Sequence, residues 1–142
     1  MRVASFDIGK KNFAMCVQDF PEDILNLCKD SKDEDYVITK LCEGGKVVAI
    51  DNLDLTTGCN AKLYLDPKVF PNMIEKLHER EGMLGSCDVF VVEQQMSFRG
   101  ARNPAALKLA QTVMTYFWVR HPGKPVIEFP AFHKGQVLGA PR

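Results

Sequence analysis

Long apolar runs and paired cysteines are both absent from the sequence. No uninterrupted apolar stretch approaches the roughly 18 residues that a membrane-spanning helix needs. We therefore expect no membrane partner, and the strand-like start of the chain predicts no signal peptide. The cysteines show no closely spaced pair, so we expect reduced thiols in an intracellular compartment rather than a zinc site. The five cysteines are Cys16, Cys28, Cys42, Cys59 and Cys87.

Net charge is also absent, because 18 basic side chains balance 18 acidic ones. A net charge of zero argues against a nucleic-acid binder, but the charges are unevenly distributed. Residues 93–142 hold seven basic and two acidic side chains, a net charge of +5, which leaves −5 for the first 92 residues. A basic C-terminal third is typical of a surface that faces phosphates, although many plain solvated surfaces look the same.

The 142 residues suit a single domain, 1–142, and contain no internal repeat or low-complexity stretch. Five segments have strand character, and the fourth is a continuous apolar run that we expect in the middle of a sheet. Only a short Gly-Lys-Lys connection separates the first two segments, so they should pair as a hairpin. The predicted strands cover residues 2–8, 12–18, 46–53, 87–93 and 125–129.

A first helix is predicted after the third strand, beyond a connection at residues 54–65. Asp66 has the character of its N-cap, with Pro67 at the first helical position. Gly82 and Gly85 are expected to end it. Its expected buried residues recur at helical spacing; they are Val69, Phe70, Met73, Ile74 and Leu77.

A second helix is predicted before the last strand. Asn103 should cap it, with Pro104 at its start, and residues 121–123 should terminate it. Trp118 on this helix is assigned to the core or to a dimer contact. The expected buried stripe is Leu107, Ala110, Val113, Met114 and Phe117.

Residues 21–45 are rich in charge and glycine, and we interpret them as an insertion or long loop with a helical turn at 22–28. The remaining order is strand, strand, strand, helix, strand, helix, strand. An antiparallel meander followed by crossover helices predicts an α/β fold with a mixed sheet and helices on its faces.

Asp7 is the first residue that points to chemistry, because it lies in an apolar strand between Phe6 and Ile8. An unpartnered carboxylate in such a place costs several kcal/mol, so the group should be paired, hydrogen-bonded or metal-bound. Two interpretations stay open. Asp7 is either a functional carboxylate or a cap for the turn that begins at Gly9.

Glu93 is the second, because it ends the predicted central strand and is followed by two glutamines. Ligands collect at the C-terminal ends of parallel strands, although termination of the strand by a polar residue is the simpler alternative. If the first and fourth strands are neighbours, Asp7 and Glu93 meet at one edge. Paired carboxylates suit Mg²⁺, and a two-metal site would hydrolyse phosphodiesters. Such a site usually has three or four carboxylates, and only two are convincing here.

Several blocks of the sequence resemble RuvC-type Holliday junction resolvases, members of the RNase H-like superfamily. The stretch SFDIGKKNFA is similar to the first motif, most of all in the poxvirus and large-DNA-virus branch and also in the fungal mitochondrial one. Later blocks resemble the second motif with its following helix, and the fifth strand with the loop beyond it. Together they cover roughly a third of the chain in the family's order and spacing. The blocks are residues 5–14, 91–95, 99–103, 106–111, 126–129, 134 and 137–139.

The resemblance implies a dimeric, Mg²⁺-dependent endonuclease, with Mn²⁺ as a substitute, that resolves four-way DNA junctions by paired nicks. Its implied fold is an RNase H-like mixed five-stranded sheet flanked by helices. Asp7 and Glu93 match the first two metal-binding carboxylates. Lys134 matches a loop lysine that approaches the scissile phosphate, with a plain solvated lysine as the alternative. The family's acidic pair on a final helix has no match before Arg142. We therefore expect a chain truncated before that helix, which binds metal weakly and cuts poorly.

Six further side chains are candidates for DNA contact. Two lysines follow the first carboxylate on its turn, within reach of backbone phosphates. An aromatic residue just past Glu93 can wedge against unstacked bases at a branch point, with core packing as the alternative. Two arginines stand where the second helix begins, which favours phosphate binding, and a lysine on that helix fits a plain surface position equally well. In order, these are Lys10, Lys11, Phe98, Arg99, Arg102 and Lys108.

Three other classes stay open on the sequence alone. Actin-like ATPases and sugar kinases begin with a similar Asp-x-Gly hairpin, but they need a second Gly-rich phosphate loop that the sequence lacks. A non-catalytic junction-binding module would account for the missing acids. Another RNase H-like nuclease would act on RNA–DNA hybrids or on ends. The favoured resemblance implies a viral replication site in the cytoplasm, with the mitochondrion as the alternative compartment.

Overall fold

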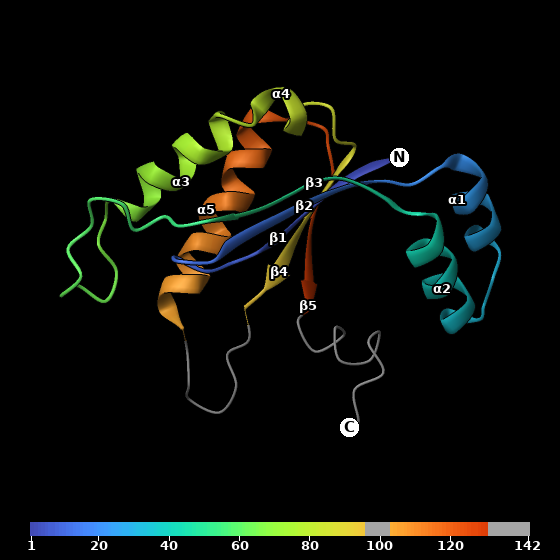
Figure 1. Ribbon diagram of the computed structural model, residues 1–142, viewed down its shortest axis with the longest axis horizontal. Helices are drawn as coiled ribbons and strands as arrows, with labels where there is room; N and C mark the ends of the chain where they lie inside the picture. Colours follow the sequence, from blue (N-terminus) through green and yellow to red (C-terminus); the bar gives the residue numbers. More distant parts are fainter. Residues whose placement is uncertain (96–102, 131–142) are drawn as a thin grey trace.

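One mixed sheet of five strands organises the computed structural model, which describes residues 1–95 and 103–130 (Figure 1). The strands are β1 Arg2–Asp7, β2 Phe13–Asp19, β3 Lys46–Leu53, β4 Val89–Gln94 and β5 Val126–Pro130. Their order is β3-β2-β1-β4-β5, with antiparallel pairing among the first three and parallel pairing of β4 with both β1 and β5. The predicted hairpin, mixed sheet and contact between the first and fourth strands are confirmed.

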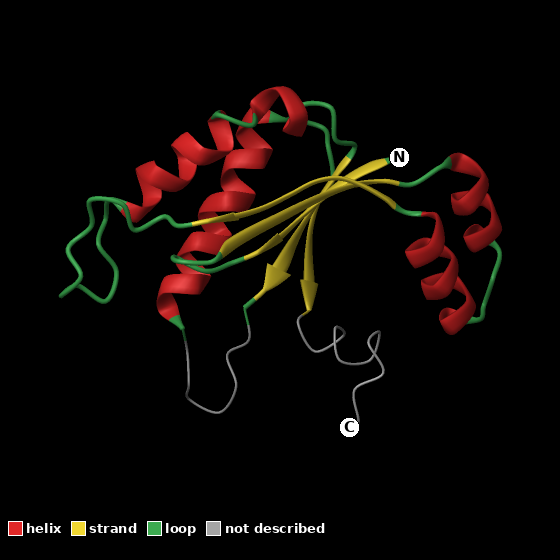
Figure 2. Ribbon diagram, in the orientation of Figure 1, coloured by secondary structure: helices red, strands yellow, loops and turns green. Residues whose placement is uncertain are grey.

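The helices form two groups (Figure 2). They are α1 Glu22–Lys29, α2 Glu34–Gly44, α3 Val69–His78, α4 Glu81–Leu84 and α5 Pro104–Arg120. The last three lie together over one face of the sheet, whereas α1 and α2 stand apart at the end of the molecule where the N-terminus lies. Among the described residues, no helix combines the length and apolar character needed to cross a membrane.

The hydrophobic core lies between the sheet and α3 and α5, because alternate residues of each strand point toward these helices. Phe6 of β1 and Phe90 of β4 are buried there. Phe90 stacks on Phe117 of α5 with ring centroids 4.0 Å apart. The residues that alternate with them along the strands, such as Ser5 and Val91, lie on the opposite face. The described parts of the chain place no helix over that face (Figure 1).

Residues 21–45 form a helical hairpin rather than a long loop, and the helical turn predicted at 22–28 is confirmed as part of α1. Their high density of charge concealed two short amphipathic patterns whose apolar sides pack against each other. Asp33 caps α2 by accepting the backbone N–H of Tyr36 at 3.1 Å. The half-buried residues between the two helices are Ile24, Leu25 and Cys28 of α1 and Val37, Ile38 and Leu41 of α2.

The predicted ends of the first helix need correction. Asp66 caps the turn that precedes α3 rather than the helix itself, because its carboxylate accepts the backbone N–H of Lys68 at 2.9 Å. The helix ends at His78. The two expected terminators, Gly82 and Gly85, lie in the short α4 and directly after it. Predicted helix boundaries differ most from the observed ones where a turn leads into a helix, since the turn and the helix satisfy the same backbone groups.

The start of α5 is as predicted, but part of its buried stripe is not. Asn103 accepts the backbone N–H of Ala106 at 3.2 Å, as an N-cap should. Leu107 is 38% exposed and Ile74 of α3 is 36% exposed, so neither belongs to the core. Trp118 is 48% exposed, which excludes its assignment to the core. Because α5 is apolar on several sides, periodicity alone does not identify its buried face. The buried residues are Ala105, Ala106, Leu109, Ala110, Val113, Tyr116 and Phe117.

His121, which follows α5, gives the fold a pH-dependent element. It is buried, its ring stacks on Phe90 at 5.1 Å between centroids, and its Nε2 lies 3.5 Å from a carboxylate oxygen of Glu81. Burial lowers the pKa of His121, against the opposing attraction of Glu81. Between that lowered value and the ordinary pKa of about 6.5, the unfolded chain binds a proton that the folded chain does not. Stability should therefore fall as the pH drops through this window.

We expect acidification below pH of about 6.5 to destabilise the protein more than a His121→Phe variant, which keeps the aromatic contact but cannot titrate. The measurement is the free energy of unfolding of both proteins at several pH values. A difference between them that does not change with pH would contradict the assignment.

Candidate active site

Asp7 and Glu93 stand at the ends of neighbouring parallel strands. In the pairing of β1 with β4, Phe6 lies opposite Val92, so the two acids are the next residues along their strands. Because Phe6 and Val92 are buried in the core, the alternation of the strands turns both carboxylates to the open face. Both acids line one cavity of about 210 Å³, which we name the carboxylate pocket. The sheet thus brings together the two residues that the sequence suggested as a pair.

The rest of the carboxylate pocket is mostly apolar. Asp7 at its rim is exposed and Glu93 is half-buried. The hydroxyl of Ser5 donates to the carbonyl of Cys16 at 3.3 Å, and burial raises the pKa of the Cys16 thiol. Apolar surroundings lower the local dielectric, which strengthens the attraction between carboxylates and a cation. The apolar lining comes from several strands and includes Ala14, Cys16, Ile50, Val91 and Phe129.

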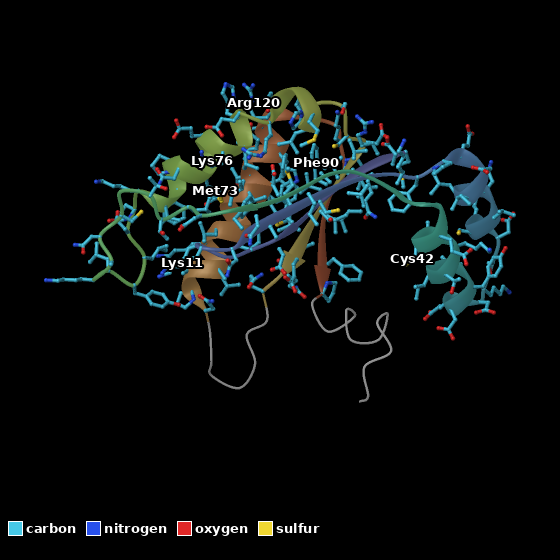
Figure 3. All side chains as sticks on the ribbon, in the orientation of Figure 1. Lys11, Cys42, Met73, Lys76, Phe90 and Arg120 are labelled. Carbon is cyan, nitrogen blue, oxygen red and sulfur yellow. The ribbon has the colours of Figure 1, made fainter. Side chains whose placement is uncertain are left out.

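The β1–β2 turn places Lys10 and Lys11 at the end of the sheet where β1 finishes. Gly9 permits this tight turn, because a Cβ there would lie only 2.9 Å from the carbonyl oxygen of Asn12. Lys10 donates to the carbonyl oxygen of Tyr64 at 2.7 Å, and its ammonium lies 5.5 Å from the centre of the Tyr64 ring. Lys11 is exposed (Figure 3). Both lysines therefore lie on the turn that directly follows β1, three and four residues after Asp7.

The other predicted contacts are less closely tied to the pocket. Lys108 is exposed on the second turn of α5. Glu128 of β5 lies opposite Val92 in the sheet, so its side chain is on the face that carries the helices, where it is exposed, and away from Glu93. Four predicted contacts lie outside the described residues; they are Phe98, Arg99, Arg102 and Lys134.

Asp7 and Glu93 offer the oxygen donors that Mg²⁺ prefers. This ion is commonly held by one or two protein carboxylates together with waters and substrate phosphate oxygens, so the pair fits it in kind and in number. Within residues 1–95 and 103–130, no group of three or more His, Cys, Asp or Glu side chains is placed to hold a metal. Water and substrate oxygens would therefore complete the coordination of an ion held by Asp7 and Glu93.

Two viral proteins align with nearly the whole chain. Uncharacterized protein 170L of Invertebrate iridescent virus 6 is 33% identical over 153 aligned positions, which cover 97% of this chain and 58% of 170L. Uncharacterized protein 97L of Invertebrate iridescent virus 3 is 30% identical over 159 positions, which cover 98% of this chain and 75% of 97L. The chain belongs to the 97L family. It spans 58% of the length of 170L, and no protein-family model matches it.

This member of the 97L family has the fold of RuvC-type Holliday junction resolvases. Thermus thermophilus RuvC matches with a TM-score of 0.62 at 14% identity, over 99% of this chain and 70% of RuvC. The same RuvC in complex with a Holliday junction substrate also gives 0.62. The fowlpox virus Holliday junction resolvase matches with a TM-score of 0.50 at 18% identity, over 92% of this chain and 61% of the resolvase. The predicted RNase H-like architecture is confirmed.

The folded shape of residues 54–68 does not follow from the predicted connection at residues 54–65 and the predicted helix start at Asp66. Asp54 accepts the hydroxyl and the backbone N–H of Thr56, which lowers the pKa of Asp54. Asp66 accepts the backbone N–H groups of Asn60 at 2.6 Å and Lys68 at 2.9 Å, which lowers the pKa of Asp66. In both cases an aspartate binds the backbone two residues further on, a spacing that signals a turn and could have been recognised.

Proposed function

We propose that this chain is the nuclease domain of a metal-dependent endonuclease that resolves four-way DNA junctions. The observation that carries the proposal is the juxtaposition of Asp7 and Glu93 in the carboxylate pocket, at the ends of two parallel strands. Catalytic groups gather at such strand ends in α/β sheets.

In this proposal Asp7 and Glu93 hold Mg²⁺, or Mn²⁺ in its place, over the open face of the sheet. When bound, the ion activates water and stabilises the leaving oxygen of a phosphodiester. Lys10, Lys11 and Lys108 contact backbone phosphates, and outside the described residues Phe98, Arg99, Arg102 and Lys134 contribute to the DNA surface.

Support for a junction as the substrate comes from the shared fold with RuvC and the fowlpox virus resolvase. Cutting two opposing strands of a junction requires two active sites, so we propose that the protein acts as a homodimer. The iridescent virus relatives support a viral origin, and a cytoplasmic site of viral replication would supply branched DNA.

The test is metal-dependent nicking of a synthetic four-way junction. Because the chain spans 58% of the length of 170L, the assay uses the product of the complete reading frame. We expect paired nicks in the junction with Mg²⁺ or Mn²⁺, much slower cutting of linear duplex and of RNA–DNA hybrid, and no ATP hydrolysis. Junction binding without nicking under any metal condition would favour a binding module. Preferential cutting of the hybrid would indicate a different RNase H-like nuclease.

A further inference from the structure

A second cavity, of about 360 Å³, opens beside the β1–β2 turn, and we name it the loop cavity. Its walls are the turn, with Lys10 and Lys11, and the segment 54–68 between β3 and α3. Asn60 adds a side-chain amide to this lining, whereas the hydroxyl of the lining residue Thr56 already donates its proton to Asp54. Lysine, hydroxyl and amide groups are the side chains that bind phosphate oxygens in protein–DNA complexes. The lining therefore suits a phosphate group.

The acids of this segment are engaged in local hydrogen bonds. Asp54 is occupied by Thr56, and Asp66, which lines the cavity, is only 9% exposed and accepts two backbone N–H groups. Lys68 donates to the carbonyl oxygen of Gly58 at 3.2 Å and remains exposed. The two aspartates thus stabilise the turns of the segment by local hydrogen bonds. The exposed charge of the segment is therefore the positive charge of its lysines.

Hydrogen bonds hold the segment 54–68 to the β1–β2 turn and to α3. The backbone N–H of Leu55 donates to the carbonyl oxygen of Lys10 at 2.8 Å, which joins the segment to the β1–β2 turn. The side-chain amide of Asn72 on α3 donates to the carbonyl oxygens of Leu55 and Thr57, each at 2.9 Å. A ligand would find this cavity largely preformed, which reduces the ordering cost of binding.

The electrostatic potential that favours an anion extends from the loop cavity to the start of α5. Lys10 also lines a smaller cavity of about 120 Å³, which it shares with Tyr64 and Asn103. The hydroxyl of Tyr64 donates to the Asn103 side chain at 2.9 Å, so the segment contacts the cap of α5. The 17-residue α5 directs the positive end of its dipole toward this point. The cations and the helix end therefore attract the same anion.

The opposite end of the molecule repels phosphates. Residues 21–45, which form α1 and α2, hold seven acidic and three basic side chains, a net charge of −4. Lys11 on the turn and Cys42 on α2 mark the two ends (Figure 3). A polyanion should therefore lie across the turn end and avoid the hairpin.

We propose that the loop cavity binds a backbone phosphate of the DNA strand that enters the carboxylate pocket. Lys11 of the cavity lining and Lys68, which is exposed on the same segment, supply the charge, while the side-chain amide of Asn60 supplies a hydrogen bond. This inference rests on the proposed function, because it names where the DNA is held outside the pocket. Residues 54–68 then belong to the substrate surface and orient one arm of the junction.

The first test compares Lys11→Gln/Lys68→Gln with Lys76→Gln, which removes a lysine of α3 outside both the cavity lining and the segment 54–68 (Figure 3). Binding to a synthetic four-way junction is measured without divalent metal, across a range of salt concentrations. The double variant should bind about 10-fold more weakly, and its plot of log Kd against log salt should become shallower by about one unit for each phosphate that is no longer neutralised. Lys76→Gln should match the unsubstituted protein, and Lys11→Arg/Lys68→Arg should restore binding.

Ala61→Glu provides a second variant, which leaves the hydrogen bonds of the segment in place because Ala61 is an exposed residue of the cavity lining. Its carboxylate should weaken junction binding in the same way. The free thiols Cys59 and Cys42 give a readout without substitution, since Cys59 lines the loop cavity and Cys42 is exposed on α2. Bound junction should slow alkylation of Cys59 and leave Cys42 unaffected, as followed by peptide mass spectrometry.

Unchanged affinity and salt slope in both the double variant and Ala61→Glu, or equal alkylation of Cys59 with and without junction, would overturn the inference. These outcomes are independent of catalysis, because binding is measured without metal. If the lysine variants bind normally while the carboxylate variants lose cutting, the proposed function stands and the loop cavity is excluded. If the lysine variants bind the junction more weakly while the carboxylate variants cut normally, the cavity binds DNA and the nuclease proposal fails.

Discussion

Replacing Asp7 with Asn should abolish junction cutting and leave junction binding intact. The substitution keeps the size of the side chain but removes one of the two carboxylates of the carboxylate pocket that we propose as metal ligands. Loss of a group that merely supports a metal ligand commonly costs 10- to 100-fold, so loss of the ligand itself should lower the cutting rate by at least about 100-fold. Binding should persist or strengthen, since one negative charge facing the phosphates is removed.

Glu93→Gln should behave in the same way, because Glu93 is the partner carboxylate on the adjacent strand. Glu128→Gln is the matched control. It makes the same chemical change on the next strand, but on the face of the sheet that carries the helices. Rates of junction nicking and junction affinities are measured for all three variants. Normal cutting by Asp7→Asn or Glu93→Gln, or an equal loss in Glu128→Gln, would refute the metal-site assignment.

The central sheet was predictable because its signals are local. The short connection through Gly9 dictated a hairpin, and the apolar run at 87–93 predicted an interior strand, which β4 is. The pairing of β1 with β4 then followed from topology. The helical hairpin at 21–45 was missed because its half-buried apolar residues are few and lie among many charges, so charge density outweighed periodicity.

The candidate site was predictable only in part. Asp7 and Glu93 were recognisable as acids at the ends of apolar strands. The apolar lining was not foreseen, because Ile50 and Phe129 come from strands whose register is fixed by nonlocal pairing. Alternation along β5 could have placed Phe129 beside Glu93, but only once the parallel pairing of β5 with β4 was known. The loop cavity likewise depends on how residues 54–68 fold back onto the turn.

Phe117→Ala should produce the largest loss of stability among single core substitutions. Phe117 is fully buried and its ring lies 4.0 Å from that of Phe90, 5.1 Å from Phe6 and 5.4 Å from Tyr116, measured between centroids. Replacing a buried phenylalanine with alanine costs about 3–5 kcal/mol of unfolding free energy, since the ring no longer packs and a cavity remains. The neighbouring Trp118→Ala removes a larger ring that is 48% exposed, and it should cost less than about 1 kcal/mol.

Denaturant unfolding of both variants measures this contrast, and equal losses would show that α5 packs on the sheet through another face. The same experiment bears on the site, because Phe117 packs against β1 and β4 from behind while Asp7 and Glu93 project from their other face. If the core aligns the two carboxylates, folded Phe117→Ala should cut more slowly than Trp118→Ala at a temperature where both are native, since small misplacements of catalytic groups lower rates steeply. Asp7→Asn should do the opposite and lose cutting with little change in stability. These two results together would separate the alignment of the carboxylates, which we expect to depend on the buried face of the strands, from their charge on the opposite face.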